Sequence, residues 1–230
     1  MSAEHESAQG SVGGLVSERR HPAARRPIIG HLLDAANLVT LAGLLSSILA
    51  ITFAARGDFD VAAIGLILAF FFDGVDGLVA KRLSGRTADD RAFGASLDSL
   101  VDMAGAGVAL AVVLLAYGGF GAAYIPGAFA LVGAAALRLS YFNVNGLAGG
   151  ATHYVGLPTD QAIVAFAAVM LLDAPLGRDV FPIVLYGSAM AIVALMVSPL
   201  RIPKLTGVSF YAINGVAFAI AALHAVRLVA

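Results

Sequence analysis

Long hydrophobic segments, separated by short polar or glycine-containing connections, make up most of the chain after residue 32. Seven segments can be outlined, at residues 33–55, 60–80, 95–117, 121–142, 158–173, 180–198 and 207–229. A helix needs about 20 mainly apolar residues to cross the hydrocarbon core of a bilayer. The pattern therefore predicts an all-α, polytopic integral membrane helical bundle with six or seven transmembrane helices, depending on whether residues 207–229 cross.

The first 30 residues depart from this pattern. They are polar, and they become basic toward their end, which predicts a disordered tail. Residues 19–34 can form a short interfacial helix that turns its arginines toward anionic headgroups. No apolar stretch typical of a signal peptide lies within residues 1–27, so we expect no cleavage. Residues 31–230 are interpreted as one transmembrane domain.

Composition agrees with a membrane location. Of the 230 residues, 60% are hydrophobic and only 13% are charged, whereas a soluble domain is about 45–50% apolar and about 25% charged. The chain has no cysteine, which excludes disulfides, a thiolate nucleophile and cysteine-ligated zinc. The net charge of −1 does not by itself identify a partner, and we expect no nucleic acid.

The basic residues predict the orientation. If the N-terminus is cytoplasmic, all of the 14 lysines and arginines lie on the cytoplasmic side except Arg56, Arg178 and Arg227. Such an excess of cytoplasmic positive charge is typical of multi-pass proteins. We therefore expect a protein of the inner (cytoplasmic) membrane whose segments 60–80 and 95–117 meet at a cytoplasmic connection.

Four aspartates lie at or near this connection. Asp73 and Asp76 are spaced i, i+3, and Asp98 and Asp102 are spaced i, i+4, so each pair shares one helical face. A carboxylate at the bilayer centre costs about 2.5–3.5 kcal/mol on insertion scales. Two divalent cations would offset four such charges, and oxygen ligands suit Mg²⁺ or Mn²⁺.

These residues resemble the signature of the CDP-alcohol phosphotransferases, DxxDGxxAR followed by GxxxDxxxD. The matching positions are Asp73, Asp76, Gly77, Ala80, Lys81, Gly94, Asp98 and Asp102. The resemblance implies that the four aspartates ligate a pair of divalent metal ions. It also implies that Asp102 is the base that takes a proton from an acceptor hydroxyl.

Two features differ from the family pattern. Lys81 replaces the family's arginine, although Arg82 follows directly, so either residue could bind the diphosphate of the substrate. The spacer at residues 82–93 is a few residues longer than usual, and its polar sequence is interpreted as a cytoplasmic loop.

Small and polar residues beside the aspartates predict a nucleotide site. Asn37 and Thr40 resemble the family's NxxT element, and their side chains suit a base edge or a phosphate. Gly77 and Ala80 would leave a shallow helix wall for the nucleotide, and Gly94 would let two helices approach. The alternative is ordinary packing of small residues and hydrogen bonding between helices.

A second cluster resembles the phosphatidylserine synthase branch of the family. It comprises the run at 137–144, which contains Arg138, and the sequence His-Tyr-Val-Gly-Leu-Pro-Thr at 153–159. Arg138 could hold the carboxylate of an acceptor or a lipid phosphate, or it could simply extend to the membrane surface. Tyr141 stands where many members carry a second arginine. Asp160 could favour its helix N-terminus or contact a polar substrate.

The resemblance implies transfer of a phosphatidyl group from CDP-diacylglycerol to a small alcohol, with release of CMP. L-serine is the acceptor that the resemblance to the phosphatidylserine synthase branch favours, and the small number of basic residues favours an unphosphorylated alcohol. Glycerol 3-phosphate, inositol phosphate or choline are alternatives, and a cation-coupled transporter is an alternative of another class. Membrane lipids are expected partners, and the family resemblance suggests a homodimer.

Overall fold

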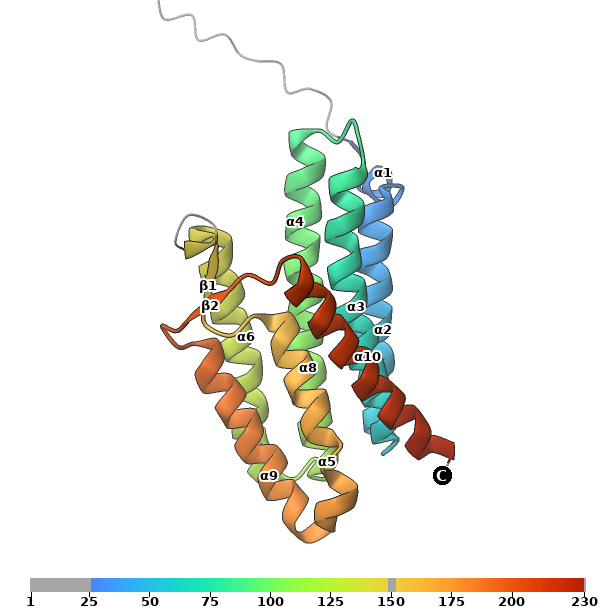
Figure 1. Ribbon diagram of the computed structural model, residues 1–230, viewed down its shortest axis with the longest axis vertical. Helices are drawn as coiled ribbons and strands as arrows, with labels where there is room; N and C mark the ends of the chain where they lie inside the picture. Colours follow the sequence, from blue (N-terminus) through green and yellow to red (C-terminus); the bar gives the residue numbers. More distant parts are fainter. Residues whose placement is uncertain (1–25, 149–151, 230) are drawn as a thin grey trace, which may run out of the picture.

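The computed structural model describes residues 26–148 and 152–229, and their elements are nearly all helices (Figure 1). The helices are α1 (Ile28–Leu32), α2 (Ala35–Ala55), α3 (Phe59–Arg82), α4 (Ala88–Asp102), α5 (Leu110–Tyr117), α6 (Ile125–Asn145), α8 (Thr159–Met170), α9 (Asp173–Met196) and α10 (Val208–Val229). A π-helical segment, Met103–Ala109, joins α4 to α5, and a 3-10 turn, Ala122–Tyr124, precedes α6.

Six helices in the described part of the chain are long and apolar enough to cross a membrane, including the one at residues 208–229. The predicted class, a polytopic helical membrane protein, is confirmed. The fifth predicted segment, α8, has only 12 residues and is shorter than the others. Of the predicted surface helix at 19–34, the structure shows α1, while residues 1–25 lie outside the described residues.

The predicted loop at residues 82–93 is wrong for its second half. Thr87 and Asp90 form a capping box: the Thr87 hydroxyl accepts from the Asp90 amide at 3.1 Å, and the Asp90 carboxylate accepts from the Thr87 amide at 3.0 Å. This pairing satisfies free amides at a helix start. Helix α4 therefore begins at Ala88, and the additional residues lengthen the helix instead of the connection.

The third membrane helix continues from α4 through the π-helical segment into α5, over Ala88–Tyr117. The π segment begins directly after Asp102 and contains two buried glycines. A Cβ on Gly107 would lie 3.2 Å from the Cβ of Ala135 on α6. The wide turn thus brings the helix backbone close to α6, directly after the end of α4 that carries Asp98 and Asp102.

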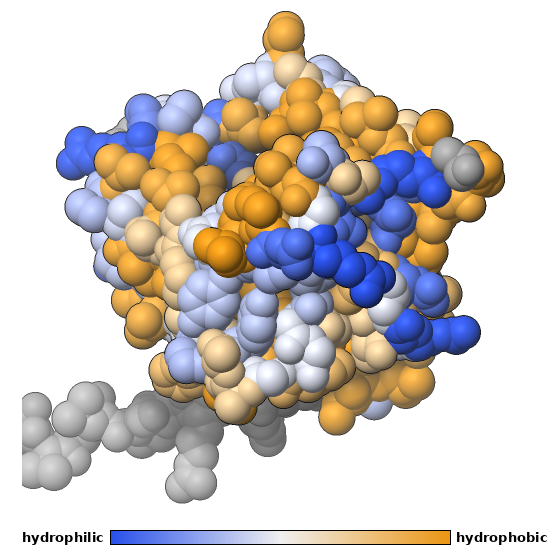
Figure 2. Space-filling model, turned by 90° about the horizontal axis from the view of Figure 1, so that it is seen from below, coloured by the Kyte–Doolittle hydropathy of each residue, from blue (hydrophilic) through white to orange (hydrophobic). Residues whose placement is uncertain are grey.

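Small residues also bring α2 and α3 together. A Cβ placed on Gly65 would lie 3.0 Å from the backbone nitrogen of Ala50, which is a close approach of two helix backbones. Large apolar side chains such as Leu66, Leu131 and Phe166 fill the centre of the bundle. Figure 2 shows hydrophobic residues around much of the rim of the molecule, with polar residues gathered on the end that faces the viewer.

Two short strands, β1 (His153–Val155) and β2 (Arg201–Pro203), form an antiparallel ribbon that the sequence pattern did not predict. The ribbon holds the segment before α8 against the segment before α10 (Figure 1). Gly156 follows with a φ of 74°, and a Cβ there would lie 2.2 Å from the carbonyl oxygen of Met196. Only glycine fits this turn without displacement.

Helix α10 lies across α3 and α8 and has few buried residues (Figure 1). A buried histidine fixes its far end. His224 Nδ1 lies 2.6 Å from the carboxylate of Asp60 on α3, and Nε2 lies 3.1 Å from the carbonyl oxygen of Ala167 on α8. One imidazole therefore connects three helices.

Candidate active site

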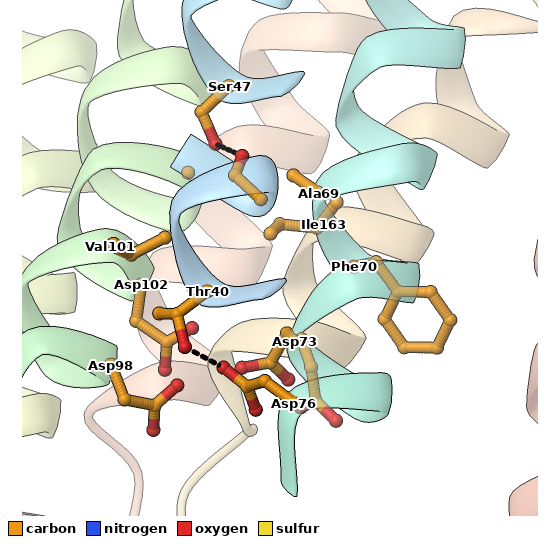
Figure 3. A pocket seen from close by; sticks show the side chains of 13 residues that line it. Thr40, Ser47, Ala69, Phe70, Asp73, Asp76, Asp98, Val101, Asp102 and Ile163 are labelled. Carbon is orange, nitrogen blue, oxygen red and sulfur yellow. Dashed lines mark hydrogen bonds between the residues drawn. The ribbon is translucent and has the colours of Figure 1, made fainter. Parts of the chain in front are cut away.

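The four motif aspartates project toward one another from two helices (Figure 3). Helix α3 supplies Asp73 and Asp76, and α4 supplies Asp98 and Asp102. Carboxylate oxygens of Asp73, Asp98 and Asp102 lie within 4.8 Å of one another. The sequence prediction that the two acidic helical faces meet is therefore matched by the geometry.

Asp76 lies beside this group of three. It is only 7% exposed, and its carboxylate accepts a hydrogen bond of 2.5 Å from the Thr40 hydroxyl on α2 (Figure 3). The space between the acids is narrow, about 10 Å³, which is roughly room for one water-sized species. Two of the residues predicted from sequence, Thr40 and Asp76, are thus in direct contact.

A hydrogen-bonded chain leads from Asp102 to Arg138. The Thr159 hydroxyl donates to Asp102 Oδ2 at 2.9 Å, and Arg138 Nη1 donates to the Thr159 oxygen at 3.3 Å. Arg138 is only 7% exposed, and its Nε has no hydrogen-bond partner among the described residues. Its guanidinium also lies 5.7 Å from the ring centre of Tyr154.

Asp160 adds a fifth carboxylate to the site. It follows Thr159 in the first turn of α8 and lines the same narrow space as the four motif aspartates. Its Oδ1 accepts from the Gln161 amide at 2.8 Å. The sequence left its role open, because an acid at a helix start has an ordinary explanation. Burial raises the pKa of the nearby Tyr154 hydroxyl, and the charge of Asp160 adds to the shift.

Two hollows reach the acidic centre from different sides of α3. The first, of about 210 Å³, lies between α2, α3 and α4 and is lined by Asn37, Thr40, Asp76, Gly77, Ala80, Arg86, Gly94 and Asp98. The second, of about 400 Å³, lies between α3, α8 and the start of α10 and is lined by Asp73, Gly77, Lys81, Tyr154, Asp160 and Lys204. Gly77 borders both hollows.

The basic residues near the signature are distributed unexpectedly. Lys81 and Arg82 are both exposed, but Lys81 lines the second hollow, whereas Arg82 lines neither. Two arginines line the first hollow, Arg86 and Arg91, and the sequence reasoning assigned neither of them to the site. Arg86 is the one held by an ion pair. Its Nε donates to Asp34 at 2.8 Å, across 52 positions of sequence. No local pattern signals such a pair.

Gly94 leaves room for the side chains of two neighbouring residues, Arg86 and Asn37. A Cβ at this position would lie 2.7 Å from Arg86 Nη2 and 3.2 Å from Asn37 Oδ1. Those contacts are tighter than van der Waals packing allows for a methyl group. The glycine therefore lets a guanidinium and an amide lie against α4.

The donor set fits a hard divalent cation. Asp73, Asp98 and Asp102 offer only carboxylate oxygens, which are the preferred ligands of Mg²⁺ and Mn²⁺. Asp76 and Asp160 bring further negative charge to the same space. Five acids gathered between apolar helices need such compensation.

Comparison with known proteins gives a consistent result. Residues 33–200 match the family model described as CDP-alcohol phosphatidyltransferase. The chain is 31% identical over 172 residues to archaetidylserine synthase from Methanothermobacter thermautotrophicus, covering 74% of this chain and 70% of that protein. It is 30% identical over 141 residues to a CDP-diacylglycerol–serine O-phosphatidyltransferase from Helicobacter pylori, covering 60% of this chain and 57% of the relative.

Proposed function

Because the chain belongs to the CDP-alcohol phosphatidyltransferase family, we propose that it transfers a phosphatidyl group from CDP-diacylglycerol to L-serine, forming phosphatidylserine and CMP. The observation that carries this proposal is the meeting of two hollows at one acidic centre, from which a hydrogen-bonded chain leads from Asp102 through Thr159 to Arg138. A substrate in each hollow would then reach the same acidic centre, beside Asp76 and Asp98 from one side and beside Asp73 and Asp160 from the other.

Members of this family generally use divalent metal ions. We assign Asp73, Asp98 and Asp102, together with Asp76, as ligands for two ions, Mg²⁺ or Mn²⁺. When bound, such ions offset the charge of a diphosphate and stabilise the charge that develops in the displacement. Thr40 holds Asp76 in a fixed orientation through its hydrogen bond.

The first hollow suits the cytidine nucleotide. Gly77 and Ala80 leave space along α3, and Asn37 and Gly94 line the opposite side. The diphosphate would lie at the inner end, beside the aspartates. Lys81 lines the second hollow, which Asp73 also lines, whereas Arg82 lines neither hollow; this favours Lys81 as the diphosphate contact.

Asp102 is assigned as the base. The serine hydroxyl oxygen forms a bond to the lipid-linked phosphorus, the bond from this phosphorus to the CMP oxygen breaks, and the hydroxyl proton moves to Asp102. The Thr159 hydroxyl donates a hydrogen bond to Oδ2 of Asp102 and thereby orients the carboxylate. Attack in line with the departing CMP requires the acceptor to approach from the side away from the nucleotide hollow.

The charges at that side favour an amino-acid acceptor. Arg138 could bind a carboxylate, and Asp160 could bind an ammonium group. Arg138 interacts electrostatically with Asp160 and Asp102, and these two aspartates line the same space. Serine carries both groups, whereas glycerol 3-phosphate, inositol phosphate and choline do not. The two relatives are named as serine-transferring enzymes, which supports the same acceptor.

We further propose that the protein is a multi-pass protein of the cytoplasmic membrane, with its N-terminus and active site facing the cytoplasm. The distribution of lysine and arginine supports this orientation. Lipid substrates would then enter from the bilayer, and serine would enter from the cytoplasm. A homodimer is proposed from family resemblance.

The direct test is to incubate purified protein with CDP-diacylglycerol, Mg²⁺ or Mn²⁺ and a panel of radiolabelled alcohols: serine, glycerol 3-phosphate, inositol phosphate and choline. We expect labelled phosphatidylserine and an equal amount of CMP. An Asp102→Asn protein should bind the CDP-lipid but not turn over. Product from another alcohol would refute serine, and absence of CMP release with every acceptor would refute the transferase assignment.

A further inference from the structure

The outer part of the α2–α3–α4 hollow contains an arginine whose position is fixed by an ion pair. Arg86 Nε donates to Asp34 Oδ2 at 2.8 Å, and Asp34 Oδ1 caps α2 through the Ala36 amide at 3.0 Å. The side chains of Asp34 and Arg86 are only 6% and 12% exposed. A buried aspartate thus anchors the guanidinium to the start of α2.

The anchored guanidinium keeps free donors. Nη2 makes one hydrogen bond, of 3.3 Å, to the Asp90 carbonyl, and within the described chain Nη1 makes none. Since the guanidinium has five N–H groups, three remain available. Its positive charge is already compensated by Asp34, so it is better suited to neutral acceptors than to a phosphate.

Asn37 presents the complementary group. Its Nδ2 donates to the His31 carbonyl at 2.9 Å, which directs Oδ1 toward Gly94. The position of a Gly94 Cβ would be 3.2 Å from this oxygen and 2.7 Å from Arg86 Nη2. An acceptor and a set of donors therefore flank one point on α4.

We propose that Arg86 and Asn37 read the base of the nucleotide, with Arg86 donating to cytosine N3 and O2 and Asn37 Oδ1 accepting from the 4-amino group. The inference rests on the proposed function, which supplies a cytidine nucleotide. Uracil has O4 in place of the amino group and N3–H in place of N3. It would therefore set acceptor against acceptor at Asn37 and donor against donor at Arg86.

The position along the hollow supports the base over the diphosphate. Asp76 and Asp98 line one part of the hollow and belong to the acidic centre, where the diphosphate is placed. Arg86 lies at the connection before α4, beside the first turn of α2. A nucleotide with its diphosphate at the acids can extend its base toward this connection.

The test compares CMP with UMP, and cytidine with uridine, by calorimetry on the purified protein with Mg²⁺. We expect the wild-type protein to bind CMP at least about 30-fold more tightly than UMP, since two unmatched polar contacts are each costly. Arg86→Lys keeps the charge beside Asp34 but loses the planar donors, and should reduce the ratio to about threefold. Arg91→Ala, which removes another cation of the same hollow, should keep the ratio.

If Arg86→Lys weakens CMP and UMP equally and leaves cytidine binding unchanged, Arg86 contacts phosphate and the proposal is overturned. A variant that does not fold is replaced by altered ligands on the wild-type protein: 3-deaza-CMP lacks the N3 acceptor, and the monophosphate of 2-pyrimidinone riboside lacks the amino group. Both should bind at least about tenfold more weakly than CMP; equal binding overturns the proposal. CMP release from CDP-diacylglycerol, measured separately on the wild type, tests the proposed function itself.

Discussion

Replacing Thr159 by valine removes one hydroxyl from the centre of the site with almost no change in shape. Thr159 is only 3% exposed, and its hydroxyl accepts from Arg138 and donates to Asp102. The valine side chain keeps the branched form of threonine, so α8 should retain its packing. The change therefore isolates the connection between the proposed base and the proposed acceptor-binding arginine.

The expected loss follows from the two contacts. A hydrogen bond to a charged group contributes about 1.5–3 kcal/mol, and here both partners of the hydroxyl are charged. Arg138 already has one buried N–H without a partner among the described residues, and the substitution leaves a second. If about 1.5–3 kcal/mol of this interaction orients Asp102 in the transition state, kcat falls roughly 10- to 150-fold.

The assay is CMP release in nanodiscs with serine titrated at saturating CDP-diacylglycerol, together with calorimetric binding of CMP. We expect lower kcat and a raised KM for serine, with CMP binding unchanged because the nucleotide hollow lies on the other side of α3. Thr159→Ser keeps the hydroxyl and should retain most activity. A Thr159→Val protein with wild-type kcat and KM would show that the hydrogen-bonded chain has no part in turnover.

Three other changes test separate parts of the structure. Gly65→Ala should destabilise the protein by about 1–3 kcal/mol, because its Cβ meets the Ala50 backbone at 3.0 Å; Gly133→Ala, where nothing lies within 4 Å, should not lower the thermal midpoint, and equal midpoints would contradict the close α2–α3 approach. His224→Leu removes two contacts that hold α10 and should cost about 2 kcal/mol in thermal unfolding with little change in the KM for serine; an unshifted midpoint would argue against the anchor. Chelation with EDTA should abolish CMP release, and added Mg²⁺ or Mn²⁺ should restore it. The same ions should raise the thermal midpoint of the wild type but not that of Asp98→Asn. A rise in midpoint that persists in Asp98→Asn would place the ion elsewhere.

Much of the fold follows from local sequence. The apolar segments correspond closely to helices because length and hydrophobicity decide membrane insertion, and the spacing of the four aspartates placed each pair on one face. The capping box at Thr87 was readable as well, since a threonine followed three residues later by an acid is a typical helix start; polarity alone suggested a loop.

The sequence did not predict the contacts of Arg86 and Thr159, for a different reason. Arg86 contacts Asp34 across 52 positions, and Thr159 contacts Asp102 across 57. These pairs form only when segments far apart in the sequence pack together, so neither periodicity nor spacing reveals them. Asp160 was visible as an acid at a helix start, but its place among the motif aspartates depends on how α8 packs against α3.

The π-helical segment after Asp102 sets how α4 is rotated about the helix axis relative to α5. Each residue of a regular helix adds about 100° of rotation, and a wide turn holds one more residue than a regular turn without adding this rotation. If Met103–Ala109 became regular helix with the chain length unchanged, Asp98 and Asp102 would rotate by about 100° relative to α5 and away from α3, although every carboxylate would still be present. Enzyme chemistry in this protein thus depends on a stretch of methionine, glycine, alanine and valine that carries no acid, base or charged group.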